Sequence, residues 1–157
     1  MGIRWATLGH VVLNVTDLKK SERFYRDVLG LRVSGRNPKT QMSFLSFGRE
    51  HHDIALVELP SVTRPVTGEN VPGLHHFCVY VKTPKEVDDL VPVLRKKGIP
   101  IVSGPEILEV AKNRSVSFLD PDGNRVEVAC NLRKFKDRKS TRLNSSHSRA
   151  SRMPSSA

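Results

Sequence analysis

The chain has 157 residues, of which 38% are hydrophobic and 27% charged, enough for one packed domain or two small fused modules. This composition excludes a disordered or collagen-like chain. Because no apolar run approaches the roughly 20 residues that span a bilayer and no signal-peptide pattern is present, we expect a cytoplasmic protein with no membrane partner. Cys78 and Cys130 form no disulfide framework, so both are expected to be free thiols.

The formal net charge of +10 is unevenly distributed. Five of the 26 Lys and Arg residues and one of the 16 Asp and Glu residues lie after position 136, so residues 1–136 carry +6. The segment DRKSTRLNSSH, from Asp137 to His147, is the translation of a common short-read sequencing adapter. We therefore expect residues 137–157 to be a disordered tail introduced by sequencing or cloning. The other basic residues are spread along the sequence without a basic cluster interleaved with aromatics, which argues against a nucleic-acid partner.

The first 59 residues predict one module of a strand, a helix and three strands. The first strand, residues 8–15, is short and rich in β-branched residues. Thr16 and Asp17 can cap a helix whose apolar residues recur at three- and four-residue intervals until Gly30. Three strand-like runs complete the module, at residues 31–34, 42–47 and 53–59.

A second copy of this pattern follows a connector, residues 60–73, that contains three prolines and two glycines. Thr83 and Glu86 form a capping box at the start of the second helix, and Pro92 is expected to kink that helix or confine its regular part to one side. The predicted strands of this second module, residues 74–136, lie at 76–81, 99–102, 115–119 and 125–130.

Two similar modules with one helix each predict an α+β fold, because each helix can cover only one face of its sheet. Aligning His10 with His76 superposes strand on strand and helix on helix. Since side chains alternate along a strand, the apolar faces should meet the helices and turn His10, His76 and Glu127 toward a shared concave side. Two imidazoles, one carboxylate and open positions for a substrate can hold divalent iron, manganese, zinc or nickel.

Four segments of the sequence carry a family resemblance: GHVVLNVTDLKKSERFYRDVLGL, HHDIALVEL, GLHHFCVYV and FLDPDGNRVEV. Together they resemble the vicinal oxygen chelate superfamily, which includes glyoxalase I, fosfomycin-resistance transferases, bleomycin-resistance proteins and extradiol ring-cleavage dioxygenases. The resemblance covers about residues 6–132. It implies two tandem βαβββ modules forming a curved mixed sheet around a divalent metal held by His10, His76 and Glu127. It also implies a small-molecule substrate and is compatible with a homodimer.

Branches of this superfamily differ in the segment before and within the fourth strand. His52 corresponds to the acid/base histidine of extradiol dioxygenases, whereas Glu58 corresponds to an additional metal ligand of glyoxalase I. The two residues are six positions apart, roughly 20 Å along a straight strand, so both can scarcely reach one metal. Extradiol enzymes also carry a tyrosine shortly before the last strand, where this chain has Ser117-Phe118-Leu119.

The leading interpretation is an iron(II)-dependent extradiol dioxygenase acting on a catechol-like substrate, with His52 as the acid/base group. One alternative is a glyoxalase I-like lyase or isomerase, in which Glu58 or Glu127 abstracts a proton. The other is a metal-free small-molecule binding protein similar to bleomycin-resistance proteins.

Overall fold

The computed structural model describes residues 7–59 and 72–134, which form two compact units. Among these residues, unit 1 holds 7–59, 72–75 and 119–124, and unit 2 holds 76–118 and 125–134. The expected connector, residues 60–73, falls outside the described residues except for its last two positions. The expected tail, residues 137–157, falls wholly outside them.

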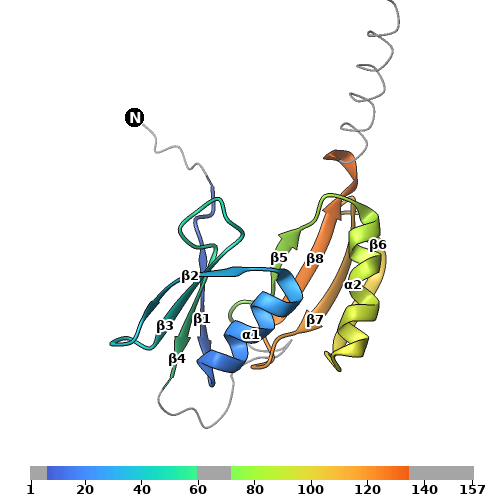
Figure 1. Ribbon diagram of the computed structural model, residues 1–157. Helices are drawn as coiled ribbons and strands as arrows, with labels where there is room; N and C mark the ends of the chain where they lie inside the picture. The colour runs from blue at the N-terminus through green and yellow to red at the C-terminus, as the bar shows by residue number, and fades with distance from the viewer. Residues whose placement is uncertain (1–6, 60–71, 135–157) are drawn as a thin grey trace, which may run out of the picture. The chain divides into compact units, whose positions relative to one another are not determined.

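Unit 1 contains one helix and one four-stranded sheet (Figure 1). Its elements are β1 (Val11–Val15), α1 (Leu18–Leu29), β2 (Arg32–Asn37), β3 (Met42–Ser46) and β4 (Ile54–Glu58). The strand order is β1-β4-β3-β2, with β1 and β4 parallel and the other neighbours antiparallel. Because β1 and β4 are parallel, the chain segments that lead into them meet at the same edge of the sheet.

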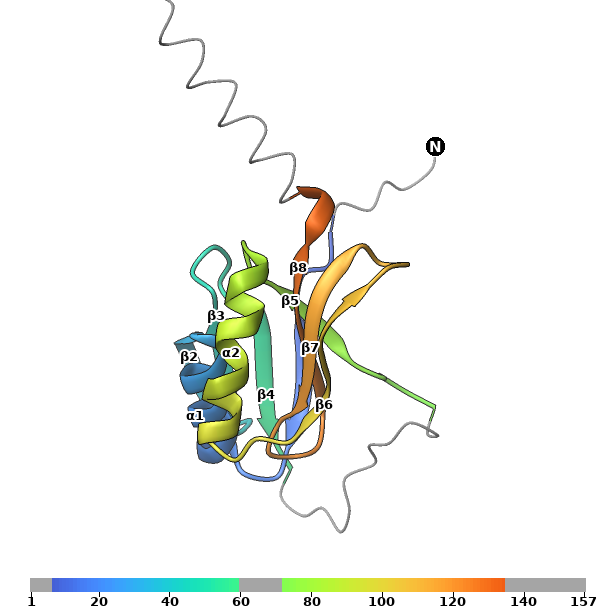
Figure 2. The same ribbon diagram turned by 90° about the vertical axis from the view of Figure 1, so that its right-hand side faces the viewer.

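Unit 2 repeats this arrangement, and Figure 2 shows its long β6 and β7 strands in yellow and orange. Its elements are β5 (Phe77–Tyr80), α2 (Pro84–Lys96), β6 (Ile101–Leu108), β7 (Asn113–Leu119) and β8 (Arg125–Asn131). The strand order is β5-β8-β7-β6, and β5 and β8 are parallel. Neither helix in the described part of the chain is long and apolar enough to cross a membrane.

The α+β class and the repeated strand, helix and three-strand order are confirmed, and the limits of several elements differ from expectation: β2 extends to Asn37, for example, and β7 begins at Asn113. β1 begins at Val11 rather than at residue 8, because its pairing with β4 begins at Val11. β6 continues to Leu108 because it pairs with β7 as far as Asn113. α2 continues on both sides of Pro92, so its regular part is not confined to one side. Pro92 is exposed, which leaves water free to satisfy the carbonyl that loses its partner.

Alternation along the strands decides which side chains enter the two cores. Leu13 and Val15 of β1 are buried, while Asn14 between them and Val12 before them are exposed. In β8 the expected apolar residues Val126 and Val128 are buried, but Glu127 between them is only 8% exposed. The last strand is therefore buried on both faces, and a carboxylate is held inside it.

Two aspartates of the turn between β7 and β8 are buried in unit 1, where they accept hydrogen bonds from α1 and the residues before it. Asp120 accepts from the Tyr25 hydroxyl at 2.7 Å, and Asp122 accepts from the Thr16 backbone N–H at 3.0 Å and from the hydroxyls of Thr16 and Ser21. Burial and the two carboxylates raise the pKa of Tyr25 far above its ordinary value. Tyr25 therefore remains a hydroxyl donor at any physiological pH.

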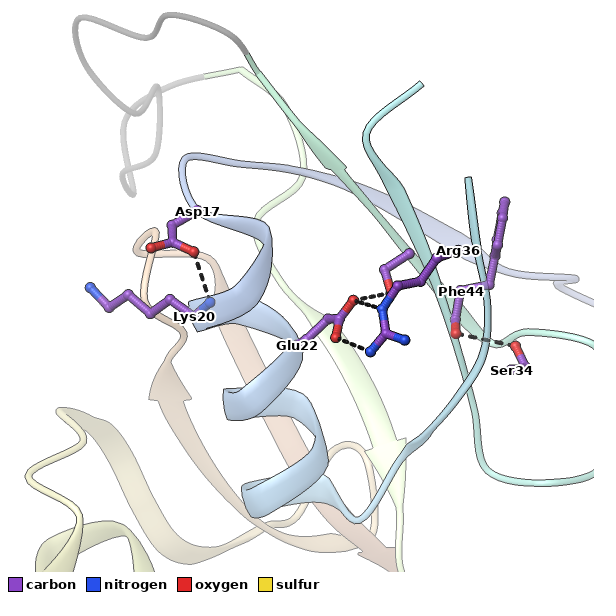
Figure 3. Close-up of polar contacts among 7 residues, drawn as sticks. Asp17, Lys20, Glu22, Ser34, Arg36 and Phe44 are labelled. Atoms are coloured by element: carbon purple, nitrogen blue, oxygen red, sulfur yellow. Dashed lines mark hydrogen bonds and ion pairs between the residues drawn. The ribbon is translucent and has the colours of Figure 1, made fainter. Parts of the chain in front are cut away.

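Another buried acid, Glu22 of α1, accepts hydrogen bonds from residues of β2 and β3 (Figure 3). Its two carboxylate oxygens accept from Nε and Nη2 of Arg36 at 2.9 and 2.7 Å, and the Ser43 hydroxyl donates to one of them. These hydrogen bonds, chiefly those from Arg36, lower the pKa of Glu22 below its ordinary value of 4.5 despite the opposing effect of burial. The pair therefore favours the folded state while Glu22 is ionised.

We expect Glu22→Gln to lower the free energy of unfolding by about 1–3 kcal/mol at neutral pH, because it leaves Arg36 and Ser43 with a neutral partner. The parent should hold this advantage fully above about pH 4.5 and lose it as pH falls through the lowered pKa of Glu22. Urea unfolding at several pH values would measure both effects.

Asp89→Asn is the matched control, since the Lys85–Asp89 pair is exposed and should contribute less than about 1 kcal/mol. The stabilising role of the Glu22–Arg36 pair would be contradicted if the two variants lost equal free energy of unfolding. It would also be contradicted if the difference in free energy of unfolding between the parent and Glu22→Gln stayed the same at acid pH.

Candidate functional site

A cavity of about 480 Å³ lies in unit 1, at the edge where the segments leading into β1 and β4 meet. It is lined by residues 7–10 before β1 and residues 49–53 before β4. The volume of this cavity is within the range of volumes found for small-molecule sites. It contains His10 and His52, two of the residues singled out from the sequence, together with His51.

Hydrogen bonds fix the conformation of the loop that carries His51 and His52. The Phe47 backbone N–H donates to Asp53 Oδ2 at 2.7 Å, and the Ser46 hydroxyl donates to the Glu50 carbonyl at 2.7 Å. The Val11 backbone N–H then donates to the Asp53 carbonyl at 3.1 Å, which joins the loop to β1. His52 therefore lies in this loop, before the first residue of β4.

Four aromatic rings come together in this loop region. The His52 ring lies 4.4 Å from the His10 ring, 5.1 Å from the Phe44 ring and 5.1 Å from the His51 ring, measured between centroids. His51 also contacts Phe44, at 5.6 Å. Burial, followed by repulsion from His10 and His51, lowers the pKa of His52 below its ordinary value of 6.5. The neutral imidazole, which can accept a proton, is therefore favoured near neutral pH.

In unit 2, His76 and Glu127 lie side by side. His76 directly precedes β5, and Glu127 lies within β8, the parallel neighbour of β5. His76 Nε2 lies 3.2 Å from Glu127 Oε2. The other carboxylate oxygen, Oε1, is buried and has no hydrogen-bond partner among the described residues. A buried acceptor left without a donor is costly, and a cation would satisfy it.

Cys78 faces Glu127 directly in the β5–β8 register. Burial and the neighbouring carboxylate raise the pKa of the Cys78 thiol to about 12. The thiol is therefore protonated at neutral pH and is not a nucleophile there. Neither Cys78 nor Cys130 forms a disulfide with a described residue.

Glu58, the alternative candidate from the sequence, lies at the end of β4 beside the start of α1. Its Oε2 accepts a hydrogen bond from the backbone N–H of Leu18 at 2.8 Å. The first turn of α1 contains no acidic residue, so Glu58 supplies the negative charge that the positive end of the helix favours. The geometry therefore gives Glu58 a helix-capping role.

The sequence-predicted residues are thus divided between the units: His10, His52 and Glu58 belong to unit 1, and His76 and Glu127 to unit 2. Within residues 7–59 and 72–134, no group of three or more His, Cys, Asp or Glu side chains is placed to hold a metal ion. Sequence reasoning missed His51 and Phe44. The adjacent histidines were the one signal that could have drawn attention to His51.

Comparison with known proteins gives one family match over nearly the whole described chain. Residues 7–128 match the model of the Glyoxalase/Bleomycin resistance protein/Dioxygenase superfamily. The chain is 32% identical over 127 residues to virulence protein STM3117 of Salmonella typhimurium, covering 78% of this chain and 82% of that protein.

Two further relatives have names that refer to enzymes. The chain is 34% identical over 122 residues to biphenyl-2,3-diol 1,2-dioxygenase 3 of Rhodococcus globerulus, covering 77% of this chain but only 61% of that protein. The crystal structure of lactoylglutathione lyase from Agrobacterium tumefaciens is similar with a TM-score of 0.62 and 27% identity, covering 82% of this chain and 97% of that one.

We expect Glu58→Ala to lower the free energy of unfolding by about 0.5–2 kcal/mol, because Leu18 loses its acceptor and the start of α1 loses its negative neighbour. Glu58→Gln keeps an acceptor oxygen and should lose less. Thermal or urea unfolding measures both.

Asp17→Ala is the control, since Asp17 caps the same helix by accepting from the Lys20 backbone N–H at 2.9 Å. If Asp17→Ala destabilises the chain and Glu58→Ala does not, the capping role of Glu58 is wrong.

Proposed function

The chain belongs to the Glyoxalase/Bleomycin resistance protein/Dioxygenase superfamily, and from this premise we propose that it is a divalent-metal-dependent ring-cleavage dioxygenase. The proposed substrates are a catechol-like compound and dioxygen, and iron(II) is the favoured metal, ahead of manganese, nickel and zinc. The similarity to a biphenyl-2,3-diol dioxygenase supports this proposal, although the chain spans about three fifths of that relative's length.

The observation that carries the proposal is the difference between the contacts of His52 and those of Glu58. His52 contacts His10 inside the cavity, whereas Glu58 is engaged by the first backbone N–H of α1. An extradiol enzyme needs an imidazole beside its metal site, and a glyoxalase I-like enzyme needs the glutamate. The contacts within unit 1 therefore favour the extradiol interpretation.

We propose His10, His76 and Glu127 as the metal ligands. The chemistry of the set fits, because the Glu127 carboxylate has a buried oxygen to which no described residue donates, and His76 lies against its other oxygen. Two imidazoles and one carboxylate suit iron(II) and leave positions open. When bound, the metal would supply Lewis-acid chemistry and, if it is iron(II), electron transfer toward dioxygen.

The residues of the chain itself would bind the ring and move protons. The cavity of about 480 Å³ is large enough for a substituted aromatic ring, and Phe44 holds the histidine rings that line it. His52, with its lowered pKa, would take a proton from a diol hydroxyl and later return it. Because this chain has Ser117-Phe118-Leu119 in the region where extradiol enzymes carry a tyrosine, His52 would perform this proton transfer without a phenolic partner from that region.

A glyoxalase I-like reaction is the second candidate, supported by the similarity to a lactoylglutathione lyase. In that reaction a glutamate would remove a proton next to a substrate carbonyl, and Glu127 would be better placed than the capping residue Glu58.

If the proposed ligand set is correct, replacing His10, His76 or Glu127 singly by alanine should remove most of the bound metal, because two donors hold a divalent cation poorly. Anaerobic purification followed by elemental analysis of protein and metal measures the stoichiometry. Glu58→Gln is the control and should keep the parent's metal content. Full metal content in all three alanine variants would refute the site.

The reaction can be tested by adding iron(II), oxygen and a panel of catechols to the full chain and recording the yellow ring-opened product. We expect product from the parent and a loss of about 100- to 10,000-fold in kcat for His52→Gln, which removes the acid/base group. Bound nickel or zinc without product would move the assignment to the glyoxalase-like reaction. A chain that binds no metal would instead be a small-molecule binding protein.

A further inference from the structure

His51 has no role in the proposed reaction, yet it makes the shortest polar contact to His52. We propose that His51 is a positioning residue, which accepts a hydrogen bond from Nδ1–H of His52 and so leaves Nε2 of His52 facing the cavity as the proton acceptor. The catalytic consequence rests on the proposed function, but the orientation of the ring does not.

The contact between the two histidines is a hydrogen bond between ring nitrogens. His51 Nδ1 and His52 Nδ1 lie 2.9 Å apart, and the ring planes are nearly perpendicular, at 86°. A neutral imidazole carries one N–H and one lone pair, so one ring must donate and the other accept. This single bond therefore couples the tautomers of the two rings.

The surroundings favour His52 as the donor. His51 is exposed, so in this arrangement its remaining N–H, on Nε2, can be hydrated. His52 is less exposed and lines the cavity, where its Nε2 would carry a lone pair. In the reverse arrangement His52 would carry its proton on Nε2, and no hydrogen bond gives that N–H an acceptor among the described residues. An N–H without an acceptor is rarer in proteins than an acceptor without a donor.

Ring contacts restrict the orientation of the His52 side chain. The His52 ring contacts the rings of His10, His51 and Phe44. Phe44 contacts His51 as well, so both members of the pair rest on one side chain of β3. A base held by packing and oriented by a second hydrogen-bonding group is the arrangement by which catalytic histidines are fixed elsewhere.

The orientation can be tested without any substrate. Long-range proton–nitrogen NMR spectra of the full chain, labelled with ¹⁵N-histidine and free of metal, distinguish the two neutral tautomers of each ring. His52 signals are identified by their loss in His52→Gln. We expect the parent to hold His52 with its proton on Nδ1, the less common form of a free imidazole.

Two variants separate hydrogen bonding from packing. His51→Phe keeps a ring against Phe44 and His52 but removes the acceptor, so His52 should revert to the Nε2–H form. His51→Asn offers an amide oxygen as acceptor and should keep the proton on Nδ1. A parent with its His52 proton on Nε2, or a His52 tautomer that is unchanged in His51→Phe, would overturn the proposal.

The catalytic part has its own readout. With a catechol that the parent cleaves, His51→Phe should lower kcat by about 10- to 100-fold with little change in KM, and His51→Asn should restore most of it. An unchanged kcat in His51→Phe, despite an altered tautomer, would overturn the catalytic role. A parent that cleaves no catechol would instead refute the proposed function and leave the NMR result to decide the orientation.

Discussion

The buried hydrogen bonds of Asp120 and Asp122 are the constraint on which the packing of the turn after β7 within unit 1 depends. They connect the turn that follows β7 to α1 and the residues before it, through Thr16, Ser21 and Tyr25. β8 begins at the residue directly after this turn. Within unit 2, the parallel β5–β8 pairing then sets Glu127 beside Cys78, and Glu127 Oε2 lies 3.2 Å from His76 Nε2.

Most of the secondary structure could be predicted because its signals are local. Asp17 and Thr83 cap the two helices as their positions in the sequence indicate, and apolar residues repeat with the correct period in each element. The limits of β1 and β6 could not be predicted, because they depend on how far a distant strand continues the pairing. The same holds for Pro92, whose effect depends on which side of α2 faces water.

The candidate site was less predictable than the fold. Alternation along strands correctly separated the buried and exposed residues of β1, but His51 and His52 lie in a loop, where alternation has no meaning. Their positions come from hydrogen bonds of Ser46 and Asp53, which sequence periodicity does not reveal. The role of Glu58 was also hidden, because its partner, Leu18, lies 40 residues away in the chain.

The buried Glu127 oxygen to which no residue in 7–59 or 72–134 donates has a consequence for the stability of the folded chain. Burying such a group costs about 1–3 kcal/mol, which is a large share of the stability of a small domain. A ligand that reaches this oxygen binds the folded chain and not the unfolded one, so it shifts the folding equilibrium by mass action. Proteases degrade the unfolded fraction, and a shift of this size can change abundance several-fold. The amount of this protein would then follow the supply of its own ligand.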